Sequence, residues 1–225
     1  LTVTGENDRP VIKNWPGTAI YSEGADPTPL ASSLSLSDAD AADAAQGQLS
    51  EAVVVFSGYV ADEDEFKFGA ATVVAGETGV DVGSGIKLAS DDAQGTLTLT
   101  LSAASGGSTA AEFQAVLRTL TYKNNNQTDL AASERKLTLT VTDTSGSGTA
   151  TSSAAELTLK VTGENDRPVI TNWPASASYS EGATDVTVLA AGLELSDADA
   201  ADAAKGPLSE AVVVFSGYVA DEDEF

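Results

Sequence analysis

Residues 96–102 have the sequence Thr-Leu-Thr-Leu-Thr-Leu-Ser. Successive side chains of a β-strand point to opposite faces, so this alternation puts three leucines on one face and four hydroxyl-bearing side chains on the other. The pattern predicts a strand with one face buried in the core and the other face exposed to solvent. Residues 137–142 and 157–161 alternate in the same way and predict two more such strands.

Further segments extend this β prediction outward. The apolar runs at 52–56 and 71–74 are typical of buried strands. Asp-Ala-Gln-Gly at 92–95 predicts a turn, to which we also assign Asp91. Many short strands with Thr- and Ser-rich outer faces indicate an all-β fold, a sandwich of two antiparallel sheets.

One short helix interrupts the strands. Thr109 and Glu112 are spaced as in a capping box, with Thr109 as the N-cap residue. Phe113, Val116, Leu117 and Leu120 follow at helical spacing and form one apolar stripe. We therefore expect one short helix per repeat, with this stripe facing the core.

The chain repeats itself. Residues 3–25 recur at 161–183 with 19 of 23 positions identical, and residues 36–66 recur at 195–225 with 29 of 31 identical. The sequence thus holds about one and two-fifths copies of a unit of about 158 residues. Tandem arrays of this kind are typical of stalks, filaments and adhesins, and rare among enzymes.

The polar segment 162–168 has the composition of a linker, because Gly and Pro bracket it. We assign residues 1–10 to the last strand of a preceding repeat plus a linker, 11–161 to a complete repeat, 162–168 to a calcium-binding linker, and 169–225 to a truncated next repeat. A boundary between Phe66 and Lys67, which would make 67–225 the domain, is the less favoured alternative. Residues 169–225 supply about three strands, too few for a sandwich. Either the sequence is a window on a longer array or a neighbouring chain completes that repeat.

The composition excludes several functions. The chain has 34 Asp and Glu against 11 Lys and Arg, a net charge of −23, and no His, Cys or Met. Without His or Cys there is no imidazole base, thiolate nucleophile or His- or Cys-bound transition metal, so no enzymatic activity is expected. The negative charge disfavours nucleic acid and anionic membranes as partners, and no stretch is long and apolar enough for membrane insertion. Carboxylates in such excess attract Ca²⁺, although a solvated acidic surface explains the count equally well.

The acidic side chains gather where predicted strands end. Successive antiparallel strands end at alternating ends, or poles, of the sandwich. The linker therefore lies at one pole and Glu23 at the opposite one. Asp38 and Asp40 lie at the first pole again, and Asp62 and Asp64 lie at the opposite pole. Ca²⁺ takes six to eight oxygen ligands, so facing carboxylates at a junction suit it. The candidate ligands are Glu6, Asn7, Asp8, Glu23, Asp38, Asp40, Asp62, Asp64, Asp143, Glu164, Asn165, Asp166, Asp197 and Asp199. For each group, simple exposure to solvent is the alternative.

These motifs resemble a known pattern. Asn7-Asp8-Arg9-Pro10, then Tyr21-Ser22-Glu23, then Asp38-Ala39-Asp40, then Asp143 at the end of a late strand, is similar to the cadherin pattern. The whole unit resembles the cadherin-like tandem repeats of giant bacterial surface adhesins, the repeats-in-toxin type among them. The segment 95–101 followed by 112–122 is similar to the central part of those repeats.

The resemblance implies an immunoglobulin-like sandwich with Ca²⁺ at each junction and a place on the bacterial cell surface. Asn7 with Asp8 and Asn165 with Asp166 match its linker ligands, Glu23 its first-strand ligand, Asp38 with Asp40 and Asp197 with Asp199 its paired ligands, and Asp143 its late-strand ligand. The family's Asp-Arg-Glu is degraded here, because Asp129 is followed by Leu130-Ala131. We therefore expect one or two ions per junction rather than three.

Two functions remain as hypotheses. The favoured one is a structural extender of a cell-surface adhesin or extracellular filament, rigidified by Ca²⁺, with neighbouring repeats of the chain or neighbouring chains of the filament as partners. The alternative is a carbohydrate- or cell-surface-binding sandwich, which needs a solvent-facing aromatic cluster. Aromatic residues make up 6% of the chain, which favours the extender. A unit of about 158 residues is long for a fold of about 100, and 76–93 is the expected insertion.

Overall fold

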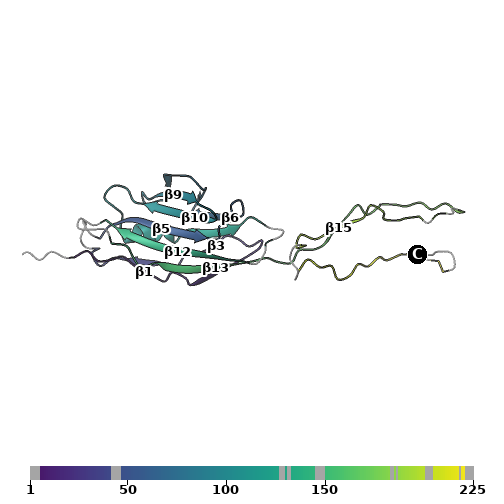
Figure 1. The fold of residues 1–225 in the computed structure, drawn as a ribbon, viewed down its shortest axis with the longest axis horizontal. Helices are drawn as coiled ribbons and strands as arrows, with labels where there is room; N and C mark the ends of the chain where they lie inside the picture. The colour runs from purple at the N-terminus through teal and green to yellow at the C-terminus, as the bar shows by residue number, and fades with distance from the viewer. Residues whose placement is uncertain are drawn as a thin grey trace, which may run out of the picture. The chain divides into compact units, whose positions relative to one another are not determined.

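The computed structural model describes residues 6–41, 47–126, 130, 133–144, 150–182, 185, 187–200, 205–217 and 219–220. The chain divides into two compact units, Leu1–Glu164 and Asn165–Phe225 (Figure 1). We call them the N-terminal unit and the C-terminal unit. The division falls within the segment 162–168, to which the sequence assigns a linker.

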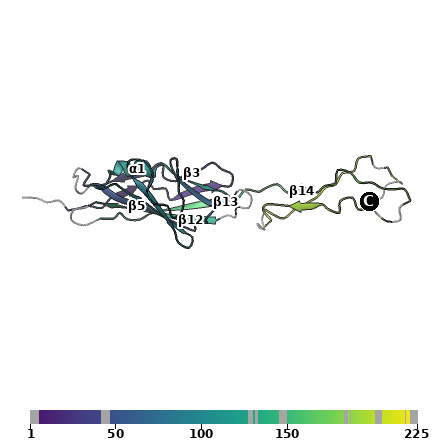
Figure 2. The same ribbon diagram turned by 90° about the horizontal axis from the view of Figure 1, so that it is seen from above.

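Two sheets build the N-terminal unit (Figures 1 and 2). The larger sheet has the order β2 (Thr18–Ser22), β13 (Ala155–Thr162), β12 (Ser133–Asp143), β5 (Leu49–Ser57), β10 (Thr96–Ser102), β9 (Lys87–Asp92) and β8 (Val80–Asp81). The smaller sheet has the order β3 (Thr28–Pro29), β11 (Leu120–Asn124), β6 (Asp64–Phe68) and β7 (Ala71–Thr72). A separate pair joins β1 (Val11–Lys13) to β4 (Ser35–Ser37). The predicted all-β sandwich fold is confirmed.

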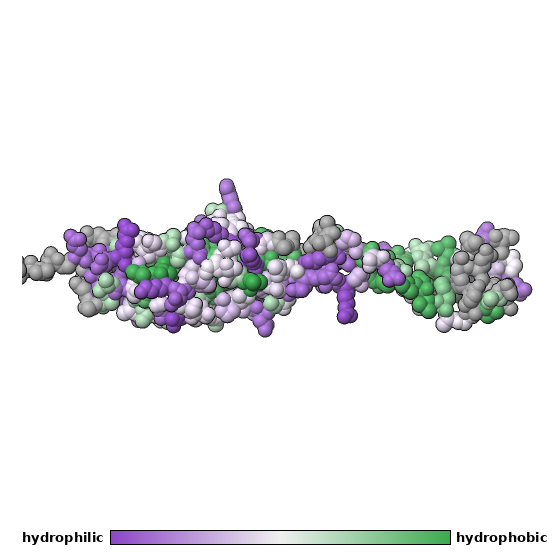
Figure 3. All heavy atoms as spheres, turned by 90° about the horizontal axis from the view of Figure 1, so that it is seen from below, coloured by the Kyte–Doolittle hydropathy of each residue, from purple (hydrophilic) through white to green (hydrophobic). Residues whose placement is uncertain are grey.

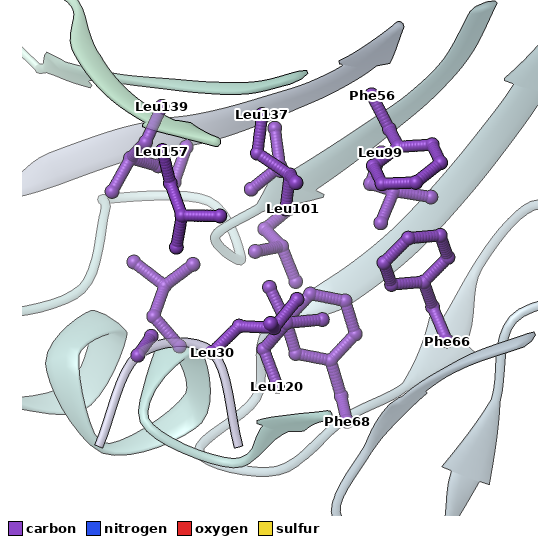
Figure 4. Packing of buried hydrophobic residues seen from close by; sticks show 14 of the residues in the cluster. Leu30, Phe56, Phe66, Phe68, Leu99, Leu101, Leu120, Leu137, Leu139 and Leu157 are labelled. Atoms are coloured by element: carbon purple, nitrogen blue, oxygen red, sulfur yellow. The ribbon is translucent and has the colours of Figure 1, made fainter. Parts of the chain in front are cut away.

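The alternating segments lie at the centre of the larger sheet. Residues 96–102 form β10, and its three leucines are at most 1% exposed. Residues 137–142 and 157–161 lie within β12 and β13 and also bury their apolar face. Figure 4 shows Phe56, Leu99 and Leu137 of this sheet facing Phe66 and other buried side chains of the smaller sheet. The hydrophobic core therefore fills the space between the two layers.

The sequence led us to expect antiparallel strand pairs throughout, but one pair is parallel. The predicted first strand is split into β1, which pairs with β4, and β2, which pairs in parallel with β13. Asn14 has a φ of 56°, and Pro16 lies two residues after it. Proline has no N–H to donate to a ladder, so the strand is interrupted here and its second half joins the edge of the larger sheet.

Two local assignments from the sequence are wrong. Residues 71–74 form the short strand β7 and its exit, where Val74 is 52% exposed, because they lie at an edge of the smaller sheet. Asp91 and Asp92 end β9, and the turn is formed by residues 93–96, in which Gln94 and Gly95 have positive φ. The expected insertion 76–93 contains β8 and β9, which widen the larger sheet at that edge.

The predicted helix is α1 (Ala110–Leu117). Thr109 is its N-cap residue, and Glu112 completes the capping box by accepting from the backbone N–H of Thr109 at 2.8 Å. Phe113, Val116 and Leu117 are buried, as the apolar stripe predicts. Among the described residues no helix is both long and apolar enough to cross a membrane.

Thr109→Ala is expected to lower the free energy of unfolding of the N-terminal unit by about 1 kcal/mol, since the backbone N–H of Glu112 loses the hydroxyl that it donates to. Urea unfolding followed by circular dichroism measures the change. Thr109→Ser, which keeps the hydroxyl, is the control and should lose much less. An equal loss in both variants would mean that the cap hydrogen bond contributes little.

The C-terminal unit repeats the start of the N-terminal unit. Its strands β14 (Val169–Thr171) and β15 (Glu194–Ser196) pair antiparallel. Val169 pairs with Ser196, as Val11 pairs with Ser37. Local sequence therefore suffices to form this small ladder in both units.

Candidate metal centre

One end of the N-terminal unit gathers the side chains of Asn7, Asp8, Asp38, Asp40 and Asp143, which we call the acidic pole. They come from the segment before β1, the segment after β4 and the end of β12. The backbone N–H of Asp8 donates to Oδ2 of Asp40 at 2.7 Å, and Nδ2 of Asn7 donates to Oδ2 of Asp143 at 2.8 Å. The structure thus brings together these five predicted ligands.

Asp38 is a buried carboxylate that lies among the other negative charges of the acidic pole. It is 8% exposed, and its Oδ2 atom is buried without a hydrogen-bond partner in the described structure. Burial raises the pKa of Asp38 above its usual value, against the hydrogen bond from the backbone N–H of Asp40; the negative charges of Asp40, Asp143 and Asp8 raise it further. A cation at this position would relieve both the desolvation and the repulsion.

The C-terminal unit repeats two of these hydrogen bonds at the corresponding sequence positions. The backbone N–H of Asp166 donates to Oδ2 of Asp199 at 2.6 Å, and that of Asp199 donates to Oδ1 of Asp197 at 2.9 Å. The corresponding distances are 2.7 Å for Asp8 to Asp40 and 2.8 Å for Asp40 to Asp38. Oδ2 of Asp166 is buried without a hydrogen-bond partner in the described structure. The arrangement is therefore a property of the repeated sequence.

The donor set suits Ca²⁺ in its chemistry, because it consists of carboxylate and amide oxygens. Each carboxylate bound to one N–H keeps further lone pairs for another partner. Among the described residues, however, no three acidic side chains are arranged so that they could hold a metal ion as they stand. Binding an ion would require the carboxylates of the acidic pole to turn toward one another.

Glu23 follows β2 near the other end of the unit. Its backbone N–H donates to the carbonyl of Thr162 at 2.8 Å, and its Oε2 accepts from the backbone N–H of Glu164 at 3.0 Å. Glu23 is 8% exposed, and its Oε1 is buried without a hydrogen-bond partner in the described structure. The first strand therefore does deliver Glu23 to the segment after β13, where the sequence places a linker.

Asp64 does not join Glu23 as the sequence led us to expect. It lies at the start of β6 with its side chain turned into the unit, where Oδ2 accepts from the backbone N–H of Val60 at 2.8 Å and from Nε of Arg135 at 3.2 Å. Its Oδ1 accepts from the hydroxyl of Tyr122 and from Nδ2 of Asn124. Burial and the hydrogen bond to Asp64 raise the pKa of Tyr122 far above its usual value. Asp64 is thus held by protein donors, and we remove it from the proposed ligands.

The remaining candidates have less defined positions. Asp62 is exposed in the turn before β6, with a φ of 70°, and Glu6 is exposed in the segment before β1. Asn165 donates through Nδ2 to the carbonyl of Asp166 at 3.0 Å. Asp129 lies outside the described residues. Arg135 was not among the predicted site residues, although its position on the same face of β12 as Leu137 marks it as inward-pointing.

The pH dependence of stability tests the electrostatics of Asp38. Its raised pKa means that ionisation destabilises the fold as the pH rises through that value, and that this destabilisation is absent below the usual value of 3.8. In calcium-free buffer, Asp38→Asn should therefore be more stable than the wild type at pH 7, by a margin that shrinks toward pH 4. Urea unfolding at a series of pH values measures this margin. A margin independent of pH would contradict the assignment.

Comparison with known proteins gives little further information. No family model matches the chain, and no curated protein matches it. Among solved structures the chain is similar to AggA, the major subunit of aggregative adherence fimbriae type I of Escherichia coli, with a TM-score of 0.27 and 11% identity over 71% of this chain and 99% of the other. We base no step of the functional argument on so low a similarity.

Proposed function

We propose that this repeat is a structural extender of a cell-surface adhesin or extracellular filament, and that Ca²⁺ at the acidic pole stiffens it. The observation that supports this most is that the hydrogen bonds from Asp8 to Asp40 and from Asp40 to Asp38 recur between the corresponding residues of the second unit. A repeated structural unit gains length from copies, whereas a catalytic or binding site gains little from near-identical neighbours.

The proposed ligands divide by position. Asn7, Asp8, Asp38, Asp40 and Asp143 would hold an ion in the N-terminal unit, and Asn165, Asp166, Asp197 and Asp199 are the counterparts of the first four in the C-terminal unit. Glu23 and Glu164 are the candidates at the other end. The ion would supply positive charge to carboxylates that repel one another.

Stiffening follows from where these residues lie in the chain. Asp8 belongs to the segment before β1, whereas Asp40 belongs to the folded unit, and the backbone hydrogen bond between them already ties the two together. The carboxylates of the acidic pole repel one another, and this repulsion opposes the hydrogen bond between the segment and the folded unit. A cation shared between them would remove the repulsion and restrict rotation of the segment about the unit.

The carbohydrate-binding alternative receives no support from the N-terminal unit. Such a module needs aromatic side chains on its surface, and every aromatic side chain in the described part of this unit is buried or half-buried. Trp15 packs against the hydrophobic core. We therefore carry forward only the extender.

Hydrogen exchange of the chain with calcium and with a chelator tests the proposal. We expect calcium to slow exchange of the amides of Asp8 and Asp166, because closing the acidic pole strengthens their hydrogen bonds to Asp40 and Asp199. A variant with Asp40→Asn and Asp199→Asn should show a much smaller effect. Equal exchange rates with and without calcium would rule out stiffening by the ion.

A further inference from the structure

Two strands near opposite ends of the N-terminal unit's sequence, β2 and β13, lie side by side and run in the same direction. They pair over five residues, from Thr18 with Thr158 to Ser22 with Thr162, and we call this pair the β2–β13 ladder. Strand β13 is antiparallel to β12, which ends at the acidic pole, so β2 and β13 both run away from that pole. The chain therefore enters the ladder at one end and leaves it at the other.

Tension on the unit reaches this ladder through the chain itself. The face of the unit in Figure 3 is mostly hydrophilic or intermediate in hydropathy, with small hydrophobic areas, so that face offers no broad apolar surface by which a neighbour could hold it. A pull on the segment before β1 and on the segment after β13 draws β2 and β13 past each other along the strand direction. The ladder of β1 with β4, which has three residue pairs, lies before β2 in this path.

The direction of the pull decides how the hydrogen bonds of the ladder break. The bonds run across the strands and are evenly spaced along a parallel pair, so a pull along the strands loads all of them at once. A pull that separates the two strands from one end loads only the outermost bond and opens the ladder one bond at a time. Forced unfolding is governed by the unfolding rate, so a ladder that must break as a whole resists a given load for longer.

Further hydrogen bonds join the two strands at the end where the chain leaves the ladder. The hydroxyl of Thr162 donates to the carbonyl of Tyr21 at 3.2 Å and lies 3.2 Å from Oγ of Ser22. The backbone N–H of Glu23 donates to the carbonyl of Thr162 at 2.8 Å. The backbone N–H of Glu164 donates to Oε2 of Glu23 at 3.0 Å. The ladder is thus reinforced at the end that a pull on the segment after β13 reaches first.

We propose that the β2–β13 ladder bears tension and keeps the N-terminal unit folded when the two ends of the unit are pulled apart. The inference rests on the proposed extender role for the source of the tension. It does not rest on calcium, because the ladder consists of hydrogen bonds between strands. A filament of such repeats transmits a pull without lengthening.

Pulling the full chain in two directions tests the proposal. The chain has no cysteine, so two introduced cysteines define where a single-molecule instrument applies the load. Gly17→Cys is the common anchor, because the position is exposed and an added Cβ meets no atom within 4 Å. Arg167→Cys places the second anchor beyond the far end of the ladder, whereas Glu156→Cys places it at the same end as Gly17, two residues before Thr158.

The anchors at 17 and 167 load the ladder along the strands, and the anchors at 17 and 156 open it from one end. In buffer with a chelator, we expect the folded lifetime at one load to be at least about tenfold longer for the first pair of anchors. Each hydrogen bond that must break together with the others lengthens this lifetime about fivefold.

Two proline substitutions in β2 are matched to each other. The carbonyl of Gly17 accepts from the backbone N–H of Thr158 at 3.0 Å, and backbone groups alternate in side along a strand. The N–H of Ala19 therefore faces β13, whereas that of Ile20 faces the open edge of the sheet. With anchors at 17 and 167, Ala19→Pro should shorten the lifetime about fivefold, and Ile20→Pro should leave it nearly unchanged.

The proposal is overturned if the two directions of pulling give equal lifetimes, or if the two proline variants behave alike. If circular dichroism shows that Ala19→Pro does not fold, the comparison of the two directions decides alone. Equal lifetimes would leave the proposed calcium site standing, because every measurement is made with a chelator. A failure of the chain to bind calcium would likewise leave the result for the ladder unchanged.

Discussion

Arg135→Met is expected to lower the free energy of unfolding of the N-terminal unit by about 3–5 kcal/mol, the largest loss that we foresee for a single substitution. Nε of Arg135 lies 3.2 Å from Oδ2 of Asp64, and the two side chains are 8% and 0% exposed. Removing the guanidinium would leave the Asp64 carboxylate buried with only neutral donors, among them Tyr122 and Asn124. A buried charge without its counter-charge is far more costly than the loss of one hydrogen bond.

Lys136→Met is the matched control for this substitution. Nζ of Lys136 lies 2.9 Å from Oε1 of Glu156, but the two side chains are 54% and 60% exposed. An exposed ion pair contributes about 0–1 kcal/mol, so this neighbouring variant should unfold almost like the wild type. Urea unfolding of both variants at one pH gives the comparison. Similar small losses in both would show that Asp64 is not held as a buried ion pair.

Asp38→Asn is expected to change sign in its effect when calcium is added. With a chelator present the variant should be more stable than the wild type, because it removes one charge from the acidic pole. With calcium at about one hundred times its dissociation constant, the wild type should gain about 2.7 kcal/mol, and the variant should gain less. The Asp38 carboxylate is thus expected to destabilise the fold without the ion and to stabilise it when the ion is bound.

Thermal and urea unfolding with calcium and with chelator measure this reversal. Asp91→Asn makes the same change of net charge at an exposed position in β9, and it should show no reversal. If Asp38→Asn stabilises the protein equally in both conditions, Asp38 is a strained residue but not a ligand. If calcium stabilises neither the wild type nor the variant, the calcium proposal fails as a whole.

The strands that could be predicted from the sequence are those with strict alternation. In β10 the leucines at 97, 99 and 101 can be buried only if the segment is extended, so local pattern and tertiary packing agree. The helix was predictable for a similar reason, since Thr109 and Glu112 cap it through contacts within four residues. The division of the first strand into β1 and β2 could not be predicted, because it depends on which distant strand, β4 or β13, each half joins.

The acidic pole could be predicted because strand ends alternate between poles in a sandwich. That logic placed Asp38 and Asp40 at the pole of the linker, and the resemblance to the cadherin pattern added Asp143, which lies about a hundred residues further along the chain. It failed for Asp64, because a carboxylate at a strand end can turn into the core when a cationic side chain inside the unit pairs with it. The signal was present in the sequence, since Asp64 shares the inward face of β6 with Phe66, and Arg135 shares that of β12 with Leu137.

Equilibrium dialysis of the calcium-free chain against calcium tests the central claim most directly, because it measures binding without reference to stability or motion. We predict saturable binding of at least one ion per chain, which is weakened at least tenfold in a variant with Asp38→Asn and Asp40→Asn and unchanged by Asp91→Asn. The contradicting result is the absence of saturable binding, or binding that is the same in all three proteins.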